Sequence, residues 1–192
     1  MTRGASASVS DESPQRRTLV LTTDGDAGYI NLRGNPDDPE FVDTAGDVLG
    51  QPLPLEANTI SVSGSRRVYW LGPDEWLVGT PGSDVVRLID DLEAGLGERH
   101  VAINDLSGAY AAFRLAGDDA RSVLARGCTL DLHSRVFVTG ACAQTGLARA
   151  NVLLGLIDEA PTFELTVRRS FADYVERWLL HAGREYAITV DV

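Results

Sequence analysis

Short runs of apolar residues, separated by polar turn residues, predict a chain rich in β-strands. Runs of β-branched and aromatic residues bounded by Gly, Pro, Asn or Asp are typical of strands. The predicted strands are Thr18–Leu21, Tyr29–Leu32, Thr59–Val62, Val68–Leu71, Trp76–Gly79, Val101–Asn104, Ala109–Leu115, Val136–Val138, Ala141–Thr145, Asn151–Ile157, Thr162–Arg168 and Tyr186–Val190. Turn residues at 72–74 and 158–161 predict two hairpins.

Four other segments place their apolar residues at helical spacing. The predicted helices begin at Asn35-Pro36, Ser83, Asp118 and Ser170 and end at Gly50, Leu96, Arg126 and about His181. We expect Asn35 and Ser83 to be N-caps. Ser170 and Asp173 match a variant of the capping box.

The order of these elements predicts an α+β fold of one domain. Strand pairs followed by single helices are typical of antiparallel-rich sheets rather than of regular β-α-β winding. The chain has 192 residues, enough for one sizeable domain. Residues 1–15 are small and polar without periodicity, which predicts a disordered tail before a domain at 16–192.

Charge and composition narrow the possible partners and chemistry. The formal net charge is -11, which disfavours nucleic acid and anionic membrane as partners. The sequence has neither a signal peptide nor a long apolar run, so we expect a cytoplasmic protein. All 17 basic residues are Arg, which excludes a Walker A phosphate loop and a pyridoxal phosphate Schiff base.

The motifs of common active sites are absent from the sequence. The three His residues lack a neighbouring His or Cys at metal spacing, so no metal site is predicted. Cys128 and Cys142 do not form a C-x-x-C pair, and Ser107 does not lie in a G-x-S-x-G elbow. We therefore expect no catalytic residues and no cofactor in this chain.

Four residues are candidates for contact with a partner. Trp70 and Trp76 flank a predicted turn and belong either to the core or to an interface, where aromatic side chains contribute large contact areas. Arg168 and Arg169 lie between a strand and a helix. Each can bind a carboxylate, on this chain or on a partner, but side chains of neighbouring strand residues point in opposite directions.

Several phrases, in order along 18–182, resemble the gamma subunit family of heterotetrameric sarcosine oxidase. The matching phrases are Ile30–Gly34, Leu53-Pro54, Trp70–Leu77, Asp105–Ser107, Leu115–Gly117, Gly127–Leu132 and Arg169–Tyr174. The most specific are LGPDEWL and GCTLDL.

This resemblance implies a fold similar to that of the folate-binding aminomethyltransferases of the glycine cleavage system. It also implies a parent complex that oxidises sarcosine to glycine with FAD, FMN and NAD, and passes the one-carbon unit to tetrahydrofolate. The chain would pack against and stabilise the alpha, beta and delta subunits, with the cofactors bound by alpha and beta. A related N-methyl amino acid oxidase is an alternative parent complex.

One departure bears on folate chemistry. The resemblance places a catalytic Asp of the aminomethyltransferases within the region that reads GLARANVLL here, Gly146–Leu154, which has no carboxylate. Asp158 comes later, in a predicted turn, and does not inherit that role. The alternative hypotheses are a stand-alone folate-binding or one-carbon-transfer protein of the same fold, and an unrelated binding module that uses Arg168 or Arg169.

Overall fold

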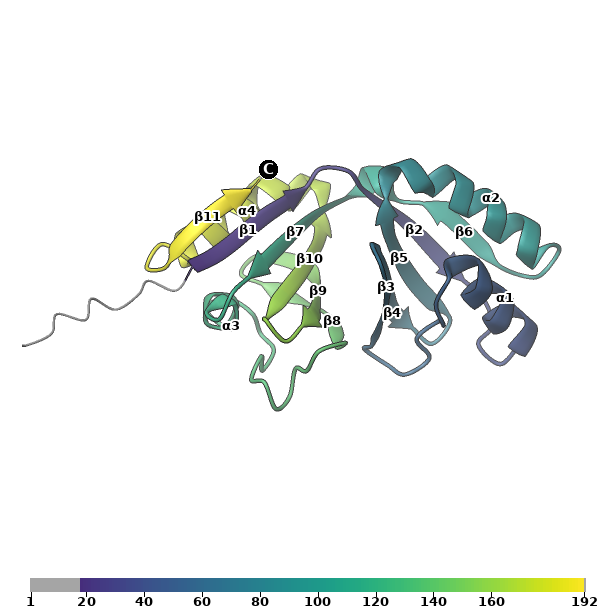
Figure 1. Cartoon of the computed structure of the whole chain (residues 1–192), viewed down its shortest axis with the longest axis horizontal. Helices are drawn as coiled ribbons and strands as arrows, with labels where there is room; N and C mark the ends of the chain where they lie inside the picture. The colour runs from purple at the N-terminus through teal and green to yellow at the C-terminus, as the bar shows by residue number, and fades with distance from the viewer. Residues whose placement is uncertain (1–17, 192) are drawn as a thin grey trace, which may run out of the picture.

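Two β-sheets face each other and carry helices on their outer surfaces (Figure 1). The structure is a computed structural model that describes residues 18–191. The six-stranded sheet has the order β11-β1-β7-β10-β9-β8, and the five-stranded sheet has the order β3-β4-β5-β2-β6. The predicted α+β class with antiparallel-rich sheets is therefore confirmed.

The six-stranded sheet contains the first and the last strand of the described chain. Its strands are β1 (Thr18–Asp24), β7 (Tyr110–Ala116), β8 (Cys142–Leu147), β9 (Ala150–Asp158), β10 (Thr162–Arg168) and β11 (Ala187–Asp191). β1 pairs with β11 in parallel, and the other neighbours are antiparallel. Helices α3 (Ala120–Leu124) and α4 (Ala172–Ala182) contribute buried side chains to the core of this sheet.

The five-stranded sheet is formed by the middle of the sequence. Its strands are β2 (Ala27–Arg33), β3 (Ile60–Ser63), β4 (Arg66–Gly72), β5 (Glu75–Pro81) and β6 (Ala102–Asp105). Helices α1 (Pro39–Leu49) and α2 (Val85–Leu96) cover its outer face (Figure 1). Phe41, Ala45 and Leu49 are buried on α1 at intervals of four residues, as the helical spacing predicts.

A third, smaller apolar cluster lies between the two sheets. Tyr29, Tyr69 and Leu77 come from the five-stranded sheet, while Cys142 and Leu153 come from the six-stranded sheet. The inner faces of both sheets also carry charged residues. Because polar groups buried between sheets need partners, this layer is the part of the fold in which a site could be built.

The structure corrects three predicted helix starts. The first helix begins at Pro39 with Asp38 as its N-cap, while Asn35 accepts a hydrogen bond from the backbone N of Asp37 in the preceding turn. Ser83 lies in a 3-10 turn (Gly82–Asp84) before α2, with no side-chain cap bond. The capping box at Ser170 does not form, because another 3-10 turn (Arg169–Phe171) precedes α4.

Two further element predictions are wrong. The third helix is confined to Ala120–Leu124 rather than running from about Asp118 to Arg126. The predicted strand 136–138 is a turn in which the backbone N atoms of Val136 and Phe137 both donate to the carbonyl of His133. Phe137 is buried between two exposed valines, so the apolar alternation is real, but this segment pairs with no strand of the described chain.

The predicted disordered tail at 1–15 lies outside the described residues. The division of the chain into this tail and one domain at 16–192 stays a prediction. Among residues 18–191, no helix has the length and apolar character needed to span a membrane.

Candidate functional site: a polar network between the two sheets

Glu164 is the centre of a charged network between the sheets. It lies on β10 directly opposite Arg114 of β7, so the two side chains share one face of the six-stranded sheet. Arg114 Nε donates to Glu164 Oε1 over 2.8 Å, and Arg67 Nε of β4 lies 3.5 Å from the same oxygen. Only 11% of the Glu164 side chain is exposed, so neighbouring charges rather than water must compensate its charge.

Tyr69 connects this carboxylate to the other sheet. Its hydroxyl donates a 2.5 Å hydrogen bond to Glu164 Oε2. Burial, followed by the negative charge of Glu164, raises the pKa of Tyr69 well above its ordinary value. The phenol therefore stays protonated at neutral pH and serves as a donor.

A second tyrosine bridges the sheets next to this network. The hydroxyls of Tyr29 on β2 and Thr166 on β10 are 3.1 Å apart. Burial raises the pKa of Tyr29 to about 12, so this phenol is also neutral. The backbone N of Tyr29 donates to Ser107 Oγ, and that hydroxyl donates to Asp105 Oδ1. Asp105 and Ser107 thus fix the backbone just before β7. The hydrogen bonds from Ser107 lower the pKa of the Asp105 carboxyl.

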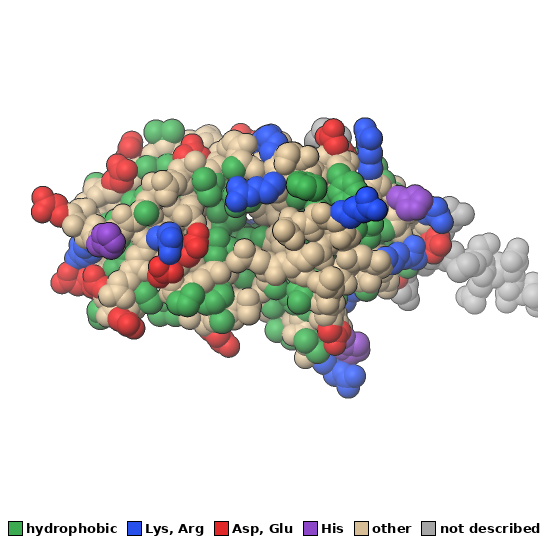
Figure 2. Space-filling view, turned by 180° about the vertical axis from the view of Figure 1, so that it is seen from behind, with side chains coloured by type: hydrophobic (Ala, Val, Ile, Leu, Met, Phe, Trp, Pro, Cys, Tyr) green, Lys and Arg blue, Asp and Glu red, His purple; other side chains and the backbone are tan. Residues whose placement is uncertain are grey.

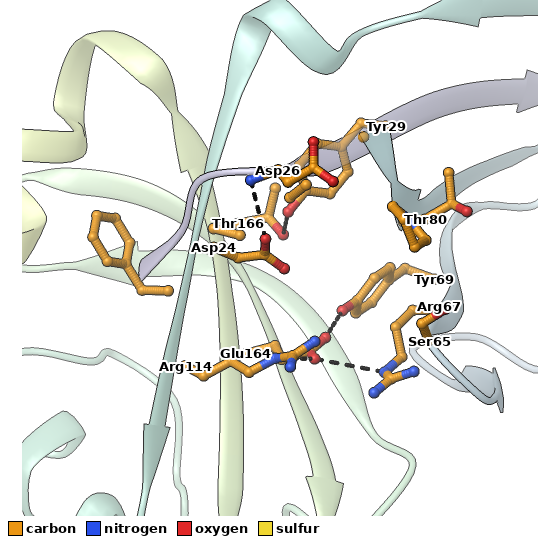
Figure 3. Close-up of a pocket in the computed structure, with 16 residues that line it drawn as sticks. Asp24, Asp26, Tyr29, Ser65, Arg67, Tyr69, Thr80, Arg114, Glu164 and Thr166 are labelled. Atoms are coloured by element: carbon orange, nitrogen blue, oxygen red, sulfur yellow. Dashed lines mark hydrogen bonds and ion pairs between the residues drawn. The ribbon is translucent and has the colours of Figure 1, made fainter. Parts of the chain in front are cut away.

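A cavity of about 290 Å³ lies beside the network (Figure 3). Arg67, Arg114 and Glu164 line one side of it, and Asp24 and Asp26 lie on the other. None of these five residues is among the site candidates predicted from the sequence. Two of them could have been recognised in the sequence, because Glu164 and Arg114 are single charges between buried apolar neighbours within strands. A charge in such a position requires a buried partner.

The four predicted partner residues fall in different environments. Trp76 is fully buried, packs near Phe41 and donates its indole N–H to the carbonyl of Pro54. Its side chain therefore belongs to the core and presents no surface to a partner. Trp70 is half-buried on the neighbouring strand β4.

The two predicted arginines are both exposed, but they make different contacts. The guanidinium of Arg168 lies 4.8 Å from the centre of the Tyr110 ring, at the border of an open groove of about 720 Å³. Arg169 donates to the carbonyls of Gly108 and Ser107 and so braces the turn before β7. Arg168 is thus the one of the pair that borders a groove.

Other residues with metal-binding or catalytic side chains lie outside this network. Within residues 18–191, no cluster of three or more His, Cys, Asp or Glu side chains could hold a metal ion. Cys142 is buried, and its burial raises the pKa of the thiol to about 12. Asp158 accepts hydrogen bonds from the backbone N atoms of Ala160 and Thr162, so it stabilises the β9–β10 turn.

Residues 33–185 match the sarcosine oxidase gamma subunit family. The chain belongs to this family. The gamma subunit of sarcosine oxidase from Corynebacterium sp. (strain P-1) is 34% identical over 172 residues, which cover 88% of this chain and 82% of that protein. The gamma subunit from Corynebacterium sp. (strain U-96) is 30% identical over 185 residues, or 95% and 88% of the two chains.

Two solved structures share the fold of this chain. This gamma-family chain is similar to a chain of heterotetrameric sarcosine oxidase from Corynebacterium sp. U-96, with a TM-score of 0.80 at 28% identity over 91% of this chain and 87% of that one. Aminomethyltransferase T of the glycine cleavage system from Bartonella henselae gives a TM-score of 0.67 at 14% identity over 91% and 48% of the chains. The aminomethyltransferase-like fold expected from the motifs is therefore confirmed.

Proposed function

We propose that this chain is a packing subunit of a heterotetrameric sarcosine oxidase, in which it stabilises the flavin-bearing subunits without performing chemistry itself. The observation that carries the proposal is the similarity to a chain of a heterotetrameric sarcosine oxidase over 91% of the sequence. The partners would be the alpha, beta and delta subunits, and the complex would work in the cytoplasm.

The reaction of the complete complex is part of the proposal. Sarcosine would be oxidised to glycine with FAD, FMN and NAD bound by the partner subunits, and tetrahydrofolate would accept the one-carbon unit. The polar network supports a non-catalytic role for this chain. Glu164 is held by Arg114, Arg67 and Tyr69, so both of its oxygens are engaged by the chain's own side chains rather than free to act as a base.

The segment 168–174 is the part of the surface that we assign to partner contact. Arg168 borders the groove, and Phe171 and Tyr174 follow with 43% and 36% of their surfaces exposed. A cation beside exposed aromatic rings is a composition enriched at the centres of interfaces. Figure 2 shows Arg and apolar side chains around a hollow in the middle of one face, while acidic side chains crowd the end that carries α1 and α2.

Coexpression tests the proposal. A tagged copy of this chain is expressed with the proteins encoded next to it in the genome and then purified under native conditions. We expect the flavin absorbance to copurify with the tag and the purified material to oxidise sarcosine. Recovery of the tagged chain without a flavoprotein would contradict the proposal.

A titration with tetrahydrofolate separates the alternative function. Stoichiometric, tight binding of tetrahydrofolate by the isolated chain would support a stand-alone folate-binding protein of this fold. The absence of a carboxylate from Gly146–Leu154, which forms part of the β8–β9 hairpin, argues against one-carbon chemistry in this chain.

A further inference from the structure

We propose that the cavity between the sheets binds a small α-amino acid as a zwitterion, with its carboxylate beside Arg67 and Arg114 and its ammonium group beside Asp24 and Asp26. The inference concerns this chain alone and does not depend on the proposed function.

The positive side of the cavity has more cations than its own carboxylate can neutralise. Both Arg67 Nε and Arg114 Nε approach the same oxygen of Glu164, and Tyr69 occupies the other oxygen as a donor. Arg67 also donates from Nη1 to the carbonyls of Gly64 and Arg66, neither of which neutralises its charge. One carboxylate facing two guanidinium groups leaves a net positive charge on this side of the cavity, which a carboxylate ligand would complement.

The negative side of the cavity lies toward solvent. Asp24 is half-buried at the end of β1, and Asp26 is exposed in the following turn. In Figure 3 these carboxylates lie across the cavity from Arg67, Arg114 and Glu164. An ammonium group bound here would be attracted by two carboxylates, and the exposure of Asp26 gives a ligand a way in.

A glycine lies in the wall of the cavity. Gly79 pairs with Tyr29 on one side and with Arg67 on the other, so these three positions form one row on the inner face of the sheet. A Cβ atom at Gly79 would lie 3.6 Å from the Tyr29 ring and 3.8 Å from the Tyr69 ring, which is ordinary contact distance. Alanine would therefore fit there and take up part of the cavity without straining the fold.

The volume limits the ligand to a small molecule. About 290 Å³ lies at the lower end of the range for ligand pockets, which suits glycine or N-methylglycine together with water. Two opposite charged ends within one small cavity favour a zwitterion over a simple amine or a simple acid, each of which would satisfy one end only.

Equilibrium dialysis of the full chain against radiolabelled glycine tests the inference. We expect one saturable site per chain with a Kd of about 1 mM or tighter. Unlabelled N-methylglycine should compete, whereas acetate and methylamine should compete at least about tenfold more weakly. Absence of saturation by about 10 mM glycine, or equal competition by acetate or methylamine, would overturn the inference.

Two variants and two matched controls locate the site. Asp24→Asn keeps an oxygen for the hydrogen bond from Asp26 N but removes the charge, and Gly79→Ala places a methyl group in part of the cavity. Each should weaken glycine binding about tenfold or more.

Asp131→Asn changes an Asp that accepts the same kind of bond, from His133 N, away from the cavity. Gly146→Ala adds a Cβ atom with similarly ordinary contacts outside it. Both controls should bind glycine like the unmodified chain. Unchanged binding in both Asp24→Asn and Gly79→Ala would place the ligand elsewhere and so refute the assignment.

Discussion

Tyr69 of β4 and Glu164 of β10 join the two sheets through a 2.5 Å hydrogen bond from the phenol to the carboxylate. These residues are 95 positions apart in the sequence, and each comes from the inner face of a different sheet. Since Arg114 and Arg67 compensate the same carboxylate, the sheets are held together by a charged network as well as by apolar packing.

Removing the Glu164 carboxylate should destabilise the protein strongly. Glu164→Ala leaves Arg114 and Arg67 facing each other without their shared partner, and loss of one member of a buried ion pair typically costs about 3 kcal/mol or more. Urea denaturation followed by far-ultraviolet circular dichroism measures the change. Asp74→Asn, which removes an exposed ion pair with Arg33, serves as the control and should leave the urea midpoint nearly unchanged. Equal midpoints for the two variants would show that the network contributes little.

A methyl group at Gly127 should also destabilise the fold, because the Trp178 ring packs directly against this glycine. Gly127→Ala forces the indole or the α3–α4 packing to move, which we expect to cost about 1–3 kcal/mol. Thermal unfolding compares this variant with Gly25→Ala, where a Cβ atom meets nothing within 4 Å. A melting temperature for Gly127→Ala as high as that of Gly25→Ala would contradict the packing described here.

The buried phenol of Tyr29 predicts a loss of stability in alkali. Its pKa is raised from 10.0 to about 12 in the folded protein, chiefly by burial. The folded state therefore holds this proton more tightly than the unfolded state between these values. The free energy of unfolding should be unaffected by this group below pH 10 and should fall as the pH rises from 10 to about 12. Urea unfolding at several pH values should show a smaller decline for Tyr29→Phe, and an equal decline in both proteins would refute the assignment.

The two thiols should react at different rates. Cys142 is buried and its thiol pKa is raised to about 12, whereas Cys128 is half-buried. Because the thiolate is the reactive form, Cys128 should be alkylated first in the native protein. Peptide mass mapping after brief treatment with iodoacetamide identifies the modified residue. Faster labelling of Cys142 would mean that the layer between the sheets opens readily to solvent.

Arg168 should matter for partner binding and not for folding. Its described contact is with the face of the Tyr110 ring beside an open groove, so Arg168→Ala should change stability by less than about 1 kcal/mol. The same variant should lower the yield of copurified flavoprotein. Arg87→Ala, an exposed arginine on α2, is the matched control and should leave that yield unchanged. Equal yields for the two variants would remove Arg168 from the interface.

The sequence predicted most strands because their apolar residues alternate between two faces, a signal that is local. Three helix starts were misplaced because 3-10 turns precede α2 and α4, and because Asp38 rather than Asn35 caps α1. The segment 136–138 has the alternation of a strand, yet Arg121 donates to the carbonyls of Leu132 and Phe137 and holds the segment as a turn.

Local patterns mark Glu164 and Arg114 as charges within apolar strands, but they do not show that these residues meet. Glu164, Arg114 and Tyr69 come from strands separated by up to 95 residues, and only the pairing of those strands brings them together. Trp76 was identified from the sequence, but its environment could not be predicted from it. A tryptophan in a hairpin suits a core and an interface equally well, and its complete burial is decided by α1, whose Phe41 packs against it.

Native mass spectrometry of the coexpressed, tag-purified material shows whether this chain is a subunit of a heterotetramer. We expect an assembly that contains one copy of this chain together with three different partner subunits and bound flavin. A mass that corresponds to this chain alone, or to copies of this chain only, would contradict its assignment as a subunit of a heterotetrameric oxidase.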